Sequence, residues 1–169
     1  MQLVYPAWEH KTEVMAYRQE FINCGETYIN GSNGLMGAKS YESWLEEITL
    51  LRSQASEGWV TSSIYFAIVS GRIIGTIALR HYLNDELLQS GGHIGYAIRP
   101  LERRKGFATQ MLGLVLEKCR AMGIAKALVT CDKDNIASAK TIINNGGVLA
   151  DEFVNDVDVI EQRYWITIL

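Results

Sequence analysis

The sequence predicts an α/β protein with a single mixed, mostly antiparallel sheet and helices on both faces. Three observations lead to this fold class. Helical and strand-like apolar periods alternate along the chain, the strand-like segments come in neighbouring groups, and no linker, repeat or low-complexity tract interrupts them. The length of 169 residues is that of one domain, so we expect a single domain over residues 1–169.

The N-terminal part predicts a short strand at residues 2–6 and then two helices. Apolar side chains recur at helical spacing from Thr12 to Cys24, and Ser40 is placed to cap a second helix over residues 41–55. Between the helices lies CGETYINGSNGLMGAK, which is rich in Gly, Asn and Ser. This composition is typical of a mobile connection.

The apolar period then changes to that of strands. SSIYFAIVS and RIIGTIALRHY are rich in β-branched and aromatic residues, and they meet at Ser70–Gly71, which predicts a hairpin. GHIGYAIR is a third strand of this group. Its internal Gly95 indicates either a β-bulge, which would free backbone N–H groups for a ligand, or a close approach of another backbone.

The C-terminal part predicts helix, strand, helix and a final pair of strands. The strongest helical pattern covers residues 106–122, and IAKALVTC follows as a buried strand. A last helix covers residues 135–145 and ends at two glycines. Its inward side chains are expected to be Ile136, Ala139, Ile142 and Ile143. VLADEFVND and EQRYWITIL predict the terminal pair of strands.

Composition excludes several classes of function. The net charge of −3 argues against a nucleic-acid-binding protein. No apolar run reaches the length of a membrane span, and the N-terminus lacks the pattern of a signal peptide. Three widely spaced cysteines without a CxxC pair indicate reduced thiols, and the scattered histidines show no metal-ligand spacing. We therefore expect a cytoplasmic protein without a metal and without a membrane or nucleic-acid partner.

One stretch, IGYAIRPLERRKGFAT, points to a ligand. Arg103, Arg104 and Lys105 stand directly before Gly106, where a helix begins, and positive charge there adds unfavourably to the helix dipole. The arrangement is reasonable if an anion binds, because the first helical turn offers unpaired N–H groups and Gly106 allows close approach. The sequence therefore predicts a phosphate site; a solvated basic turn is the alternative.

These residues resemble a signature of the GCN5-related N-acetyltransferases (GNAT family), Arg/Gln-x-x-Gly-x-Gly/Ala, which Arg103, Gly106 and Ala108 match. DNIASAKTIINNGG resembles the next segment of that family, in which an Asn opens a helix that ends in Gly. The order of elements is similar over nearly the whole chain, and the motifs over about residues 92–147. The resemblance implies an acyl-CoA N-acyltransferase-like fold, with a V-shaped gap between the fourth and fifth strands, residues 94–98 and 127–131.

The resemblance also implies acetyl-CoA as the cosubstrate in this gap. Its pyrophosphate would lie on N–H groups at the start of the helix, its pantetheine arm would bond the backbone of the fourth strand, and Asn135 would reach the arm from the other side. A plain N-cap is the alternative role for Asn135, and a core position is the alternative for Phe107. The implied cofactor-binding residues are Tyr96, Ile98, Arg103, Arg104, Lys105, Gly106, Phe107, Ala108, Thr109, Asn135 and Ser138.

The implied reaction is direct attack of a primary amine, of a small molecule or a protein, on the acetyl thioester. The amine must first lose a proton. Many family members carry a Glu as base where this chain has His93, and a neutral imidazole can accept a proton near pH 7. The alternative is a strand-edge His bonded to backbone. The Tyr that often protonates the leaving thiolate is replaced by Ile142, and Cys131 is expected to be a core thiol rather than a nucleophile.

Two other functions remain open at this point. Because the usual acid is missing, a non-catalytic acyl-CoA-binding or sensing module is the main alternative. A Rossmann-type nucleotide-binding enzyme is more distant, since it would need a second Gly-rich turn and an acidic residue about twenty positions further on. The sequence does not identify the acceptor amine, and it leaves open whether the protein forms a homodimer.

Overall fold

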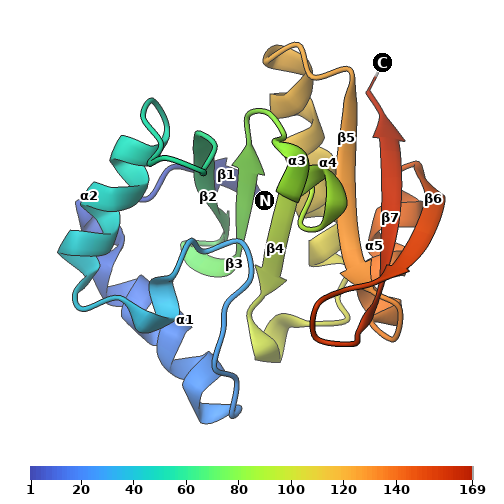
Figure 1. Ribbon diagram of the computed structural model, residues 1–169. Helices are drawn as coiled ribbons and strands as arrows, with labels where there is room; N and C mark the ends of the chain where they lie inside the picture. Colours follow the sequence, from blue (N-terminus) through green and yellow to red (C-terminus); the bar gives the residue numbers. More distant parts are fainter. Residues whose placement is uncertain (169) are drawn as a thin grey trace.

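The computed structural model describes residues 1–168 and follows the predicted order of elements, with one additional short helix, α3 (Figure 1). The elements are β1 (Gln2–Val4), α1 (Lys11–Asn23), α2 (Tyr41–Leu51), β2 (Ser62–Val69), β3 (Arg72–Arg80), α3 (Asp85–Gln89), β4 (Ile94–Ile98), α4 (Phe107–Ala121), β5 (Lys126–Asp132), α5 (Ile136–Asn144), β6 (Gly147–Val154) and β7 (Ile160–Thr167). The second predicted helix is shorter than expected, because α2 ends at Leu51.

The strands form two antiparallel groups that meet at β4 and β5. One group has the order β1-β2-β3-β4 and the other the order β5-β7-β6. β4 and β5 lie side by side and point the same way, so the parallel pair stands where the two groups meet (Figure 1). The predicted α/β fold, with its division between the fourth and fifth strands, is confirmed.

Helices cover both faces of the larger group of strands. Ile64 and Phe66 of β2 pack with α1 and α2, whereas Tyr65 and Ala67 of the same strand pack on the side of α4 and α5. Because alternate side chains point to opposite faces and both faces are covered, β2 reads as a continuous apolar run. This packing fixes the larger sheet as a rigid wall for the site beside β4.

Local turn and cap chemistry explains where several elements begin and end. Ser70 and Gly71 both have positive φ angles, 49° and 79°, as a tight hairpin between β2 and β3 requires. The Ser40 hydroxyl accepts a hydrogen bond from the Ser43 N–H at 3.1 Å, so the predicted cap of α2 is confirmed.

Of the four side chains predicted to face inward on the last helix, two are buried and two are exposed. Ala139 and Ile142 of α5 are buried, but Ile136 and Ile143 are 56% and 53% exposed. Ile136 and Ile143 are seven residues apart and therefore share one edge of the helix. α5 is a short helix at the border of the molecule, so that edge faces solvent (Figure 1).

The connection between α1 and α2 is packed rather than mobile, contrary to the prediction from its composition. Ile29 and Leu35 are fully buried, and the Trp44 indole donates to the Ser32 carbonyl at 2.8 Å. A Cβ on Gly31 would lie only 2.3 Å from the Gly95 carbonyl oxygen. Gly95 is therefore a close backbone approach; the predicted bulge is absent, because the register of β3 and β4 is regular through this residue.

Candidate active site

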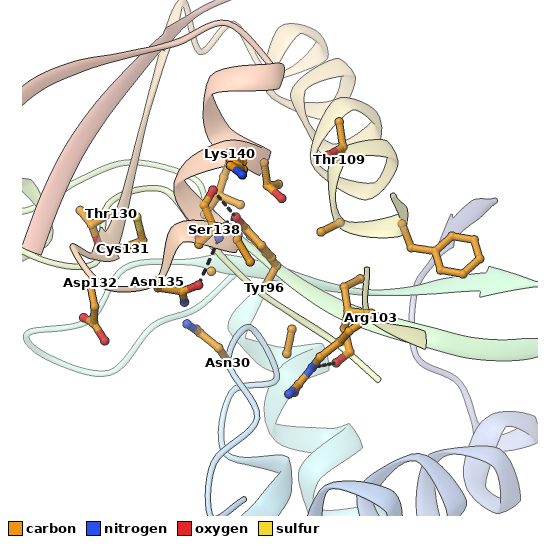
Figure 2. Close-up of a pocket in the computed structure, with 18 of the residues that line it drawn as sticks. Asn30, Tyr96, Arg103, Thr109, Thr130, Cys131, Asp132, Asn135, Ser138 and Lys140 are labelled. Atoms are coloured by element: carbon orange, nitrogen blue, oxygen red, sulfur yellow. Dashed lines mark hydrogen bonds between the residues drawn. The ribbon is translucent and has the colours of Figure 1, made fainter. Parts of the chain in front are cut away.

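A cavity of about 780 Å³ opens between β4 and β5. The N-terminal turn of α4 and the first turn of α5 form its other walls, and residues 26–30 of the packed connection border it (Figure 2). Ten of the eleven residues expected to bind the cosubstrate line it: Tyr96, Ile98, Arg103, Arg104, Gly106, Phe107, Ala108, Thr109, Asn135 and Ser138. Lys105 and His93 do not line it.

His93 holds the two groups of strands together at the closed end of the gap. Its N–H donates to the Leu128 carbonyl at 2.7 Å, and its Nδ1 accepts from the Leu128 N–H at 3.0 Å. A Cβ on the preceding Gly92 would lie 2.4 Å from the Leu128 carbonyl oxygen, so only glycine permits this approach. Beyond this junction β4 and β5 separate, and the cavity fills the space between them.

The edge of β4 presents free backbone groups to the cavity. The His93 carbonyl accepts from the Arg80 N–H, and the Arg99 N–H donates to the Ile74 carbonyl, so odd-numbered residues of this segment face β3. Because backbone groups alternate along a strand, those of Ile94, Tyr96 and Ile98 face the gap. The Ile98 carbonyl indeed accepts from Arg103 Nε at 3.0 Å. The free groups therefore arise from the separation of two strands.

The start of α4 is an uncapped helix N-terminus. Gly106 is the N-cap residue, with φ 82°, and has no side chain with which to cap. Within residues 1–168, the N–H groups of Phe107, Ala108 and Thr109 bind no acceptor. Arg104 also has a left-handed backbone, with φ 62°. Successive N–H groups in such a turn form a concave anion site, so the residues present fit a phosphate group.

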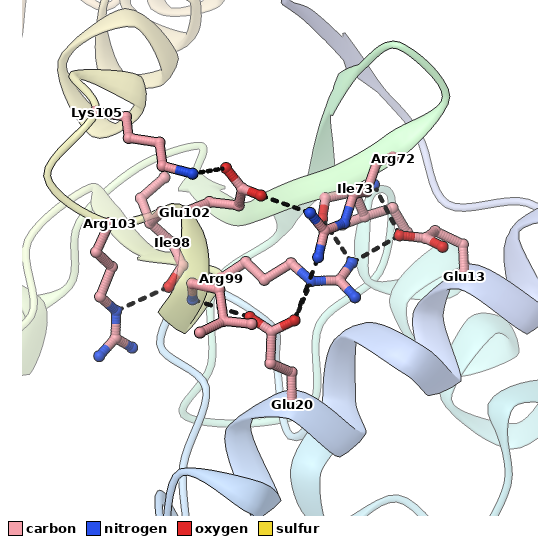
Figure 3. Close-up of polar contacts among 10 residues, drawn as sticks. Glu13, Glu20, Arg72, Ile73, Ile98, Arg99, Glu102, Arg103 and Lys105 are labelled. Carbon is pink, nitrogen blue, oxygen red and sulfur yellow. Dashed lines mark hydrogen bonds and ion pairs between the residues drawn. The ribbon is translucent and has the colours of Figure 1, made fainter.

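The three basic residues before α4 have different surroundings, and Figure 3 shows those of Arg103 and Lys105. Arg103 forms a bidentate pair with Glu26, with N···O distances of 2.8 and 2.9 Å, and thereby ties the packed connection to the end of β4. Lys105 pairs with Glu102 at 2.8 Å. Arg104 lines the cavity and forms no ion pair with any described residue.

The segment before this turn is anchored by a charged network to α1 (Figure 3). Arg99 is buried and pairs with Glu20 at 2.6 Å and with Glu13 at 2.7 Å. Burial alone would raise the pKa of Glu20, but Arg99, the Leu101 N–H and Arg72 together lower it. The network fixes the position of the chain that leads from β4 into α4.

α5 contributes a capped first turn and a hydroxyl pair. The Asn135 side-chain oxygen accepts from the Ser138 N–H at 3.1 Å, which confirms its role as a cap; its amide group also lines the cavity. The Tyr96 hydroxyl lies 2.7 Å from Ser138 Oγ (Figure 2). Burial raises the pKa of Tyr96 to about 12. The phenol therefore stays protonated at neutral pH and can donate into the gap.

The geometry favours the alternative role for His93. Its side chain is buried and its Nδ1 is occupied by the Leu128 N–H. Burial, and then the charge of Arg80, lower its pKa to about 4. An imidazole in this position holds two strands together and has no access to the cavity, so its predicted role as base has no support in the geometry. Ile142 is fully buried in the core, as its apolar side chain requires.

An acidic pair that sequence reasoning missed lies at the other end of the cavity. Asp132 of β5 stands opposite Glu161 of β7, and both line the cavity. Glu161 is buried, accepts from Ser90 Oγ and from the Asn155 amide, and has no cationic partner among the described residues. Burial, Glu161 and Asp134 raise the pKa of Asp132. Only the pairing of β5 with β7 brings these carboxylates together, and no local motif signals it.

Cys131 also lines the cavity, beside Asp132. Burial raises the pKa of this thiol to about 11. Because the thiolate is the nucleophilic form, Cys131 is almost fully protonated at neutral pH. Its surroundings are those of a core thiol, as the sequence predicts.

A parallel strand pair that separates beside an uncapped helix N-terminus has the architecture expected of an acyl-CoA N-acyltransferase. A family model described as "Acetyltransferase (GNAT) domain" matches residues 4–148. The chain belongs to the GNAT family of acetyltransferases. The predicted family and the predicted class of enzyme, an acetyl-CoA-dependent N-acyltransferase, are confirmed.

Solved structures share this fold at low sequence identity. The Microcin C7 self-immunity acetyltransferase MccE, in complex with acetyl-CoA and AMP, has a TM-score of 0.73 and 18% identity over 98% of this chain and 91% of its own. An acetyltransferase from Salmonella typhimurium that modifies the N-terminal serine of ribosomal protein L7/L12 has a TM-score of 0.68 and 18% identity, over 99% and 94%. An N-acetyltransferase from Staphylococcus aureus Mu50 has a TM-score of 0.67 and 17% identity, over 99% and 98%.

No curated protein matches the sequence at a significant level. Among residues 1–168, no three or more His, Cys, Asp or Glu side chains are grouped so that they could hold a metal ion. In the same range, no helix has the length and apolar character needed to cross a membrane.

Proposed function

We propose that the protein, as one domain over residues 1–169, transfers the acetyl group of acetyl-CoA to a primary amine of a small molecule or a protein by direct attack. One observation carries this proposal. A single cavity joins a row of free backbone N–H groups, on β4 and α4, to the buried carboxylate of Glu161, which has no cationic partner within residues 1–168.

The phosphate end of the cavity would hold the cosubstrate. The N–H groups of Phe107, Ala108 and Thr109 would bind its pyrophosphate, with Arg104 as the neighbouring free cation. The backbone of Tyr96 and the N–H of Ile98 would bind its extended arm. When bound, acetyl-CoA supplies an activated acyl thioester.

The acidic end would hold the acceptor. Asp132 and Glu161 stand directly opposite one another on neighbouring strands, and like charges so placed repel. A cationic amine would relieve this repulsion. The Glu161 carboxylate, which Ser90 and Asn155 hold by hydrogen bonds, would take the proton that the ammonium must lose before it can attack.

The remaining side chains support direct attack. Cys131, the cysteine of the cavity wall, is protonated at neutral pH and is a poor nucleophile in that form. The Tyr96 hydroxyl stays protonated and faces the gap beside Ser138. The Tyr96 hydroxyl would therefore be a proton donor on β4. The family resemblance instead implies a donor on the last helix, at the position of Ile142.

Glu161→Gln tests the proposal. Acetyl-CoA would be incubated with a panel of amines, and release of free thiol would be followed from pH 6 to 10. We expect Glu161→Gln to lower kcat about a hundredfold or more, with an unchanged calorimetric Kd for acetyl-CoA. The loss should lessen near the pKa of the free amine, about 10, where the acceptor needs no base.

Glu152→Gln is the matched control, since Glu152 is an acid of the same terminal hairpin that pairs with Lys133 outside the cavity. It should leave kcat and Kd within about twofold of wild type. Acetyl-CoA binding without thiol release for any amine would instead favour the non-catalytic module. Equal kcat for Glu161→Gln and wild type would exclude Glu161 as the base.

We also propose that the enzyme acts in the cytoplasm as a homodimer. Its three cysteines are all free thiols, as a reducing compartment allows. β6 is an edge strand and exposes Val148, Leu149 and Val154, which a second copy could cover. Light scattering of the purified protein would decide the oligomeric state; a monomer at all concentrations would contradict the dimer.

A further inference from the structure

A second charged side chain that lines the cavity, Arg80, has no counterion in the part of the chain that the structure describes. Arg80, the last residue of β3, lines the cavity, and its Nη1 donates to the carbonyls of Gly91 and Gly92 at 3.0 and 2.9 Å. Its Nε and Nη2 bind no acceptor among residues 1–168, and no carboxylate of that range pairs with it. Burial lowers its pKa, and the nearby Tyr28 opposes this shift.

Arg80 and Glu161 are attached to the same short turn. Arg80 binds the carbonyl of Gly91, and Glu161 binds the hydroxyl of Ser90, the preceding residue. Consecutive Cα atoms are about 3.8 Å apart, so the two charged side chains are anchored at neighbouring residues of one turn that lines the cavity. They are nevertheless bonded to the turn and not to each other. The Gly91 N–H is held in turn by Thr130 Oγ1 at 3.2 Å, which fixes the turn against β5.

Two opposite charges that share a cavity without pairing carry an energetic cost, because each has lost part of its hydration. A ligand with one group of each sign would remove both costs at once. An ammonium group would satisfy Glu161 and an oxyanion would satisfy Arg80, whose planar fork suits a carboxylate or a phosphonate. Tyr28, on the wall formed by the packed connection, adds a polar group near Arg80.

We propose that the acceptor is an amino acid or a close analogue, with its amine at Glu161 and its acid group at Arg80. This inference rests on the proposed function, because it names the class of amine that the same cavity would take. An acceptor that carries only an amine would leave Arg80 without an anion.

The test compares acceptors that differ only in the acid group. Free α-amino acids, each paired with its carboxamide, would be acetylated by the full chain, and kcat/KM would be measured for both members of each pair. We expect wild type to prefer the best amino acid over its carboxamide by about 10- to 100-fold, as one charge-assisted hydrogen-bond pair provides. Calorimetry of the amino acid with the CoA-saturated protein gives a second readout.

Arg80→Gln should reduce this preference to about threefold or less, because kcat/KM falls more for the amino acid than for its carboxamide. Gln retains a donor for the Gly91 carbonyl, and Arg80→Lys retains the charge without the fork and should give an intermediate preference. Lys133→Gln is the control, because Lys133 pairs with Glu152 and does not line the cavity. Thermal unfolding and acetyl-CoA binding of each variant report on folding.

Equal use of acid and carboxamide by wild type would overturn the inference, and so would a preference that survives in folded Arg80→Gln. In either case continued acetylation of carboxamides would leave the proposed function intact. If no amine at all is acetylated, the proposed function itself fails. If Arg80→Gln does not fold, kcat/KM of each amino acid and its carboxamide, measured in wild type and in Arg80→Lys, still tests the inference.

Discussion

At the scale of single residues, Arg104 and Lys105 are chain neighbours of equal charge in different surroundings. Arg104 lines the cavity and pairs with no carboxylate of residues 1–168, whereas Lys105 does not line it and is paired with Glu102. We expect Arg104→Ala to raise the Kd of coenzyme A about three- to tenfold, the effect of one exposed charge. The Kd of acetyl-pantetheine, which lacks the nucleotide, should not change. Calorimetry at two salt concentrations measures both ligands.

Lys105→Ala removes the same charge one residue away and serves as the control. It should change the Kd of coenzyme A by less than twofold. If the two variants weaken binding equally, or if Arg104→Ala weakens acetyl-pantetheine as much as coenzyme A, the basic run acts only as a diffuse charge and Arg104 has no specific role.

At the scale of elements, the two ends of α4 offer a matched pair of glycines. Gly106 at the start and Gly123 after the end have φ angles of 82° and 76°, and an added Cβ would meet no atom of either site within 4 Å. Gly106→Ala and Gly123→Ala should each cost roughly 1–2 kcal/mol of stability, because an L-residue is strained in this conformation. Only Gly106→Ala should also weaken acetyl-CoA, by tenfold or more, since it displaces the N–H groups and enters the cavity.

Chemical denaturation and calorimetry on both variants separate these effects. Equal loss of stability with unchanged acetyl-CoA affinity in Gly106→Ala would show that the N-terminus of α4 does not hold the pyrophosphate. Weakened binding in both variants would show that stability alone controls the affinity.

Elements with a strong local signal could be predicted from the sequence. The α4 pattern, the Ser70–Gly71 turn and the Ser40 cap depend on a few adjacent residues, and the structure has all three. Local composition predicts the connection between α1 and α2 wrongly, because glycine occurs both in mobile loops and where two backbones pack closely. Gly31 permits a tight contact with Gly95, and a contact between distant residues leaves no trace in local composition.

At the scale of the whole molecule, His93 joins the two groups of strands and should make stability depend on pH. Its pKa is about 4 in the folded protein, below the ordinary value of about 6.5. Between these values the unfolded chain binds the proton more readily, so stability is complete above pH 6.5 and falls as the pH falls toward 4. The full loss amounts to about 3 kcal/mol.

His93→Asn tests this origin, because its side-chain oxygen can accept the Leu128 N–H bond without titrating. We expect the free energy of unfolding in urea to fall by about 2–3 kcal/mol less in His93→Asn than in wild type between pH 6.5 and 4. Turnover at pH 8 should be within about threefold of wild type. A much larger loss of turnover in a folded variant would restore His93 as the base; parallel stability curves would contradict its role in the pH dependence.

The site as a whole could be predicted only in part. The phosphate end lies within one motif, and ten of the eleven residues expected to bind the cosubstrate line the cavity. The acidic end is assembled from two distant segments, at Asp132 and Glu161, and Arg80 joins the cavity from a third. Which strand pairs with which is decided by tertiary packing, so the pairing of β5 with β7 that brings Asp132 to Glu161 could not be predicted locally.

The packed connection between α1 and α2 can change in sequence independently of β4 and α4. Tyr28 and Asn30 line the cavity, yet they lie on a segment outside the strands and the helix that form its other walls. Substitutions at the exposed Tyr28 would change this wall of the cavity, through which we propose the amine enters, while β4 and α4 keep their geometry. A descendant enzyme could therefore exchange one acceptor for another and retain the same acyl donor.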